Sequence, residues 1–171
     1  MRQVIVTPYQ EVWGKMFETE AARLRTVFGG RLRAVHHIGS TSVPGLSAKP
    51  IIDILPVVDT LGDIESFDTA MEALGYEVKG EFGMPGRRYY RKGDDNRTHH
   101  IHLYAEGSPE IRRHVVFRDY LRQHPDEVVA YSAIKEQLAE QYPVDIESYI
   151  AGKDAFVKEM EQRALAWWYR G

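Results

Sequence analysis

The sequence contains no cysteine, no long apolar run and no large excess of charge of either sign. Without cysteine, disulfides, thiolate zinc sites and cysteine nucleophiles are excluded. No apolar run approaches the ~18–20 residues that span a bilayer. The apolar stretch in the first residues, MRQVIVTPYQEVW, is too short for a secretory signal, because Pro8 and Glu11 come too early. We therefore expect a cytoplasmic protein without membrane association.

The charges nearly cancel, with 22 Lys and Arg against 25 Asp and Glu, for a formal charge of −3. A general nucleic-acid binder needs a strong basic excess, so we expect none, although a local basic site is compatible with this balance. The apolar content of 43% is typical of a globular protein, and 171 residues suit one domain.

The spacing of apolar residues predicts an α+β fold in a single domain over residues 1–171. Aromatic and aliphatic residues recur every three or four positions between Tyr9 and Phe28, which predicts an N-terminal helix closed by Gly29. A mixed sheet of four or five strands is expected within a core at residues 1–106, and three helices form a tail at 107–171. The expected strands are 31–38, 51–58, 76–78, 87–92 and 97–104, and the expected helices after the first are 63–75, 109–123, 126–141 and 145–169.

The segment HIGSTSVPGLSAKPIIDIL, residues 37–55, is the most specific feature. Gly39 permits close approach of a ligand to the backbone, and Ser40, Thr41 and Ser42 supply hydroxyl and N–H groups. Lys49 is suited to neutralising phosphate charge. We interpret this segment as a phosphate-binding turn between two strands, with the preceding His37 bracing it.

Asp53 is the one formal charge within the apolar strand 51–58, which is expected to be central because both of its faces are apolar. One interpretation is structural: the aspartate caps a neighbouring helix or pairs with Lys49. The other is that it binds a ligand or a metal ion, since a buried charge needs a partner.

His100 and His102 lie two residues apart on a predicted strand, so their side chains share one face. They are candidates for metal ligands beside Asp53 or for a general base, and the alternative is a structural histidine pair. A four-residue loop at 93–96 predicts pairing of Arg87 with His102 and of Tyr89 with His100. This face, polar, aromatic and basic, would suit an anionic ligand that contains a base.

The helical tail carries Arg118, Lys135 and Lys153, which are candidates for phosphate contacts. The alternative is a solvated helix face with intrahelical ion pairs. His114 and His124 of the tail are expected at the surface or at helix caps.

Taken together, residues 37–55, the Trp13…Phe17 helix, THHIH at 98–102, FRDYLR at 117–122, Lys135 and Tyr149…Lys153 resemble the GrpB family. The resemblance implies a nucleotidyltransferase-like fold, in which a Gly-Ser turn cradles a triphosphate and strand carboxylates hold Mg²⁺ or Mn²⁺ for attack on the α-phosphate. It also implies kinship with a domain fused to dephospho-CoA kinase in some bacteria, where an accessory role in folding has been suggested.

The chain departs from this superfamily pattern at the strand carboxylates, which usually stand two residues apart on one face. Ile51 and Leu55 occupy the positions two residues from Asp53, and Asp59 lies beyond Pro56. A conventional two-metal site cannot be assembled from this strand, and Asp53 with His102 is the expected metal site.

Three functions remain open from the sequence. The first is a metal-dependent nucleotidyltransferase that moves a nucleoside monophosphate from a triphosphate to an unknown acceptor. The second is a catalytically silent module that binds a nucleotide or another phosphorylated small molecule. The third is a metal hydrolase based on His100, His102 and Asp53, which offers few ligands.

Overall fold

The structure is a computed structural model that describes residues 3–170. Its main elements are α1 (Val12–Phe28), β1 (Leu32–Ile38), β2 (Ile52–Val58), α2 (Asp68–Ala73), β3 (Glu77–Gly80), β4 (Arg88–Lys92), β5 (His99–Ala105), α3 (Pro109–Arg122), α4 (Pro125–Gln141) and α5 (Ile146–Arg170). Short 3-10 turns η1 (Gly29–Arg31), η2 (Ser40–Ser42) and η3 (Ile64–Phe67) connect them. Between residues 3 and 170, none of the helices combines the length and apolar character that a membrane crossing requires.

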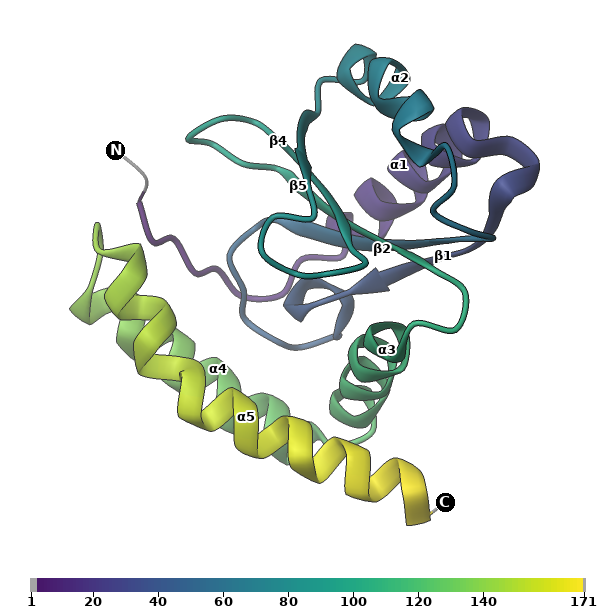
Figure 1. Cartoon of the computed structure of the whole chain (residues 1–171). Helices are drawn as coiled ribbons and strands as arrows, with labels where there is room; N and C mark the ends of the chain where they lie inside the picture. Colours follow the sequence, from purple (N-terminus) through teal and green to yellow (C-terminus); the bar gives the residue numbers. More distant parts are fainter. Residues whose placement is uncertain (1–2, 171) are drawn as a thin grey trace.

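The strands form one mixed sheet in the order β1-β2-β5-β4-β3. β2 and β5 are parallel neighbours, whereas the other pairs are antiparallel. Helices α1 and α2 cover one side of the sheet, and α3, α4 and α5 lie on the other side (Figure 1). The predicted α+β architecture with an N-terminal helix and a three-helix tail is confirmed.

Strand β2 is central, as its two apolar faces predicted. Ile52 and Ile54 pack with the α1 side chains in the main core. Leu55 and Val57 point to the opposite face, where they pack with Tyr104 and with Ile111 of α3. Asp53 shares this second face, because side chains alternate along a strand.

Helix α1 buries the predicted stripe, including Trp13, Phe17 and Leu24, and ends at Gly29, whose φ is 54°. The helix expected at 63–75 is shorter than predicted. Asp63 adopts a left-handed φ of 56°, and the segment begins as the 3-10 turn η3 before the six-residue helix α2.

The predicted register of the β4–β5 hairpin is wrong by two residues. Tyr89 pairs with His102 and Arg91 with His100, because the turn runs from residue 93 to residue 98. The Thr98 N–H donates a hydrogen bond to the Lys92 carbonyl, which closes this longer turn, and the Thr98 carbonyl accepts a hydrogen bond from the Ile52 N–H. A shift of two residues preserves the face on which each side chain lies, so the predicted polar face survives.

The segment after turn η2 is inserted into the helical tail. Val43 and Leu46 are buried among side chains of α3, α4 and α5. The Ser47 N–H donates to Ser132 Oγ at 3.0 Å and the Ser47 hydroxyl to Glu136 Oε1 at 2.6 Å. These contacts bring α4 and α5 against the turn that follows β1.

Candidate functional site

The turn at Gly39 lies directly against the carboxylate of Asp53. Gly39 has a φ of 71° and a ψ of −171°, a conformation that is essentially restricted to glycine. A Cβ at this position would lie 2.6 Å from Asp53 Oδ2. Glycine is therefore required here by backbone conformation and by the close approach of the carboxylate.

The three hydroxyl groups of η2 differ in role. Thr41 Oγ1 lies 2.9 Å from His37 Nε2, so His37 braces the turn as predicted. Ser42 is buried and its hydroxyl donates to the Gly39 carbonyl. Ser40 is half-buried, and its Oγ accepts a hydrogen bond from Lys135 Nζ.

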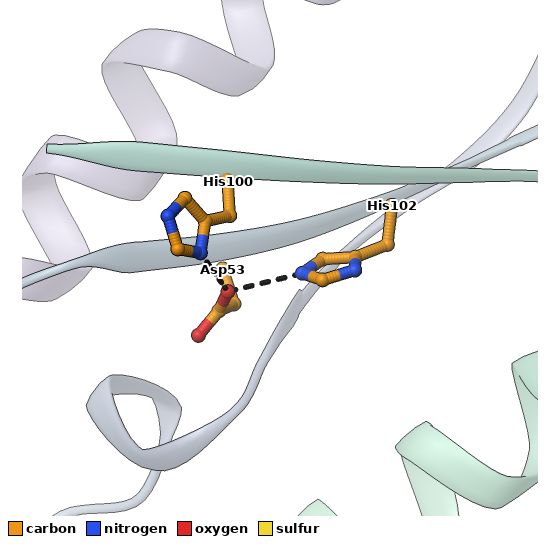
Figure 2. Close-up of side chains that lie close together, drawn as sticks. All are labelled: Asp53, His100 and His102. Atoms are coloured by element: carbon orange, nitrogen blue, oxygen red, sulfur yellow. Dashed lines mark hydrogen bonds and ion pairs between the residues drawn. The ribbon is translucent and has the colours of Figure 1, made fainter. Parts of the chain in front are cut away.

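Asp53 and the two histidines meet because β2 and β5 are parallel neighbours with Asp53 opposite His100. Asp53 Oδ1 lies 3.0 Å from His102 Nε2 and 3.5 Å from His100 Nδ1 (Figure 2). One donor atom from each of the three residues lies within 4.8 Å of the others, a spacing that can hold one metal ion. The group remains accessible, since 27% of the Asp53 side chain is exposed.

The Asp53 carboxyl is ionised at neutral pH in spite of its burial. Burial by itself raises the pKa of Asp53, but hydrogen bonds from His100 and His102 and the charge of these rings outweigh it and hold the pKa well below its ordinary value. A deprotonated carboxylate is the form that binds a metal ion.

A cavity of about 140 Å³ adjoins this group. It is lined by Ser40, Thr41, Ala48, Lys49, Ile51, Asp53, His100, Lys135, Tyr149 and Lys153. The lining thus combines three lysines with a single carboxylate. Such an excess of positive charge in a confined space favours an anionic ligand.

The lysines of the cavity are held by aromatic rings and by the turn. The ammonium groups of Lys49 and Lys153 lie 5.2 and 5.1 Å from the centre of the Tyr149 ring. Lys135 Nζ also donates to the Ser47 carbonyl at 3.3 Å. Burial lowers the pKa of Lys135, and the charges of Lys153 and Lys49 lower it further.

Two buried polar atoms at the cavity, His100 Nε2 and Tyr149 Oη, have no hydrogen-bond partner within residues 3–170. Buried polar groups are nearly always hydrogen-bonded, so such atoms need an explanation. Both residues line the cavity, and a ligand oxygen placed there would satisfy them.

The structure brings together most of the residues singled out from the sequence. Gly39, Ser42 and His102 adjoin the cavity lining through the contacts described above. Arg87, Tyr89 and Arg118 are not among the described residues that line it. Arg87 donates to the carbonyls of Glu81 and Phe82, and Arg118 donates to the His37 carbonyl at 3.2 Å.

Two residues of the site were not predicted. Tyr149 was named only as part of the family resemblance and not as a candidate for the site, although its spacing of four residues from Lys153 places both on one helix face. His114 was expected at the surface or at a cap, but its ring lies 5.9 Å from that of His102. Burial lowers the pKa of His114 to about 3, since Ile111, His114 and Arg118 form the face of α3 turned to the sheet.

Comparison with known proteins identifies close relatives. Residues 3–163 match a family model described as GrpB protein. The UPF0157 protein YqkA of Bacillus subtilis (strain 168) is 49% identical over 97% of this chain, which spans about half of the YqkA sequence (48%). A dephospho-CoA kinase of Mycolicibacterium paratuberculosis is 25% identical over 96% of the chain and 46% of the kinase.

Solved structures extend the comparison. The GrpB protein from Enterococcus faecalis has a TM-score of 0.93 and 46% identity, and the match covers 96% of this chain and 99% of that one. A mutant of the Cid1 poly(U) polymerase bound to MgATP has a TM-score of 0.52 and 11% identity, over 79% of this chain and 43% of Cid1. At such low identity the likeness concerns the fold alone, which is nucleotidyltransferase-like.

Proposed function

This chain belongs to the GrpB family, and we propose that it transfers a nucleoside monophosphate from a nucleoside triphosphate to an acceptor with one divalent metal ion. In this reaction the acceptor bonds to the α-phosphorus and loses a proton, and the bond to the pyrophosphate oxygen breaks. The observation that carries the proposal is the cavity in which the Asp53–His100–His102 group meets three lysines and the Gly39–Ser42 turn.

The roles of the residues follow from their positions. Ser40 and the turn would bind phosphate oxygens through hydroxyl and N–H groups. Lys49, Lys135 and Lys153 would neutralise phosphate charge, which is the main requirement of phosphoryl and nucleotidyl transfer. Tyr149 Oη and His100 Nε2, which lack partners among the described residues, would complete the contacts to the ligand.

Asp53, His100 and His102 would hold the metal ion, and a bound ion would add positive charge where the phosphates bind. One carboxylate with two imidazoles is a donor set of first-row transition metals, whereas Mg²⁺ is bound mainly by carboxylates, phosphates and water. Of the two ions expected from the sequence, Mn²⁺ therefore suits this group better than Mg²⁺.

A second candidate function is a silent module that binds a phosphorylated small molecule. It is favoured by Ile51 and Leu55, which stand where the superfamily places further carboxylates. Ile51 lines the cavity and Leu55 is fully buried, so neither position supplies a second metal ligand.

Thermal shift and calorimetry with ATP, UTP and inorganic tripolyphosphate, with Mn²⁺, Mg²⁺, Zn²⁺ or no metal, test the proposal. We expect nucleotide binding to require metal and to be lost in Asp53→Asn. Asp59→Asn is the matched control, since Asp59 is paired with Arg31 away from the cavity and the charge change is the same. Release of pyrophosphate from labelled triphosphate then reports transfer.

The outcomes separate the candidates. Nucleotide binding that is independent of metal and unchanged in Asp53→Asn would leave the silent binding module. A response to zinc with no effect of nucleotide would favour the metal hydrolase. Absence of any phosphate-dependent stabilisation would refute both phosphate-binding functions.

A further inference from the structure

A second cluster of side chains lies beside the histidine pair and is formed by β3, β4 and the loop between them. The Phe82 side chain is 49% exposed, and its ring is stacked on that of Tyr89 with centroids 5.2 Å apart and planes inclined by 17°. Phe82 also has a φ of 50°, which is uncommon for a residue other than glycine. The loop thus holds a large apolar ring half-exposed against Tyr89.

Cations surround the two stacked rings. Lys79 Nζ and the Arg91 guanidinium lie 5.1 and 5.5 Å from the centre of the Phe82 ring, and the Arg87 guanidinium lies 4.8 Å from that of Tyr89. Glu77 pairs with both Lys79 and Arg91, so one carboxylate is shared between two cations. We call Phe82, Tyr89, Lys79, Arg87 and Arg91 the aromatic surface.

The aromatic surface adjoins the metal-donor group. The Tyr89 ring lies 5.7 Å from the His100 ring and 5.4 Å from the His102 ring. His100 also lines the lysine cavity, whereas Tyr89 does not. The histidines therefore stand between the lysine cavity and the aromatic surface, which would be the arrangement for a donor on one side of the metal and an acceptor on the other.

We infer that the aromatic surface binds the acceptor, and that this acceptor is a nucleotide whose base stacks on Phe82 and whose phosphate meets Lys79, Arg87 and Arg91. The inference rests on the proposed function, because it assigns a second substrate to the same metal group. An exposed aromatic ring stacks on any base, and neighbouring cations add affinity for the phosphate. The surface thus selects an aromatic, negatively charged molecule over a simple phosphate or an uncharged alcohol.

The test is calorimetric titration of AMP into the full chain with saturating Mn²⁺ and tripolyphosphate, which occupies the lysine cavity. Phe82→Gly removes the ring and suits the positive φ, and we expect it to weaken AMP binding about tenfold or more. Phe82→Tyr should retain the affinity of the unchanged protein. Tyr169→Ala is the control, because it removes an exposed aromatic ring (71% exposed) at the far end of α5.

Ribose 5-phosphate lacks the base. Its affinity for the unchanged protein should be lower than that of AMP by the same factor by which Phe82→Gly weakens AMP binding. The inference is overturned if AMP does not bind, if Phe82→Gly binds AMP as tightly as the unchanged protein, or if ribose 5-phosphate matches AMP. Failure of this inference can be told apart from failure of the proposed function. That function fails if ATP and tripolyphosphate do not bind, and Phe82-dependent binding of AMP would then show a nucleotide site without a transferase.

Discussion

The Lys135 side chain is almost fully buried, with 2% of its surface exposed, and it reaches the cavity beside two other lysines. Its burial and the charges of Lys153 and Lys49 lower its pKa, and Asp53 only partly offsets them. A buried ammonium group costs free energy unless an anion compensates it. At the residue scale, the buried Lys135 ammonium group lowers folding stability at the cavity, and the proposed phosphate ligand would compensate its charge.

Replacing Lys135 with Met should therefore change folding stability and ligand binding in opposite directions. We expect Lys135→Met to raise the free energy of unfolding of the ligand-free protein by about 1 kcal/mol, because it removes the buried charge and keeps the length of the side chain. Binding of tripolyphosphate should weaken tenfold or more. Urea unfolding and calorimetry measure the two effects.

The control for this variant is Lys158→Met, since Lys158 is 70% exposed and pairs with Asp154 on α5. Lys158→Met should change neither the free energy of unfolding nor the affinity for tripolyphosphate appreciably. A Lys135→Met protein that is less stable and still binds tripolyphosphate normally would show that Lys135 has only a structural role.

At the scale of elements, the contact between α4 and α5 places Lys153 and Tyr149 in the cavity. Gly152 precedes Lys153 in the interior of α5, where glycine is unfavourable by about 1 kcal/mol relative to alanine. A Cβ at this position would lie 2.6 Å from Leu138 Cδ2 of α4. Glycine therefore leaves room for the Leu138 side chain where α4 packs on α5.

Gly152→Ala should lower the free energy of unfolding by about 1 kcal/mol, because the contact with Leu138 outweighs the gain in helix propensity. It should also weaken tripolyphosphate binding through displacement of α5. The double variant Gly152→Ala with Leu138→Ala should recover part of that binding, and a double-mutant cycle on urea unfolding and calorimetry measures the coupling.

Gly14→Ala is the matched control in α1, since a Cβ built there meets no side chain or distant backbone of residues 3–170 within 4 Å. Gly14→Ala should raise the free energy of unfolding by about 1 kcal/mol, because alanine has the higher helix propensity. Equal stabilisation by Gly152→Ala would show that the contact between residue 152 and Leu138 costs nothing.

At the scale of the whole molecule, buried histidines make the fold sensitive to acid. Burial lowers the pKa of His37 to about 4, the charges of Arg122 and Arg118 act in the same direction, and Asp53 opposes them. Burial also lowers the pKa of His36, His99 and His114. The folded state therefore binds fewer protons than the unfolded state below the ordinary histidine pKa of 6.5.

Stability should consequently be complete above pH 6.5 and should fall as the pH drops toward 4. His37 alone accounts for a loss of about 2 kcal/mol between pH 7.5 and pH 5. Urea unfolding of the metal-free protein at several pH values measures how steeply the free energy of unfolding falls with pH. His37→Gln should reduce this slope, whatever its effect on the free energy of unfolding at pH 7.5. An identical slope in His37→Gln would show that this residue does not titrate as described.

Much of the fold was accessible from the sequence because its determinants are local. The three-to-four-residue period of α1, the apolar strand β2 and the turn at Gly39 depend on residues close together in the chain. The shared face of His100 and His102 depends only on strand periodicity, so a register wrong by two residues did not affect it. Residue spacing was also sufficient to place Asp53 in a central strand.

What the tertiary structure decided concerns pairs of residues that are far apart in the chain. Local patterns cannot show that Lys92 pairs with the buried Glu20 of α1 at 3.3 Å, that His99 Nε2 lies 3.5 Å from the same carboxylate, or that His114 faces the sheet. The cavity itself exists because α4 and α5 pack onto the segment after η2 and bring Lys135 to Ser40. The sequence by itself determined the α+β fold and the presence of a single carboxylate, Asp53, on strand β2. Only long-range packing decided which lysine side chains lie beside this carboxylate.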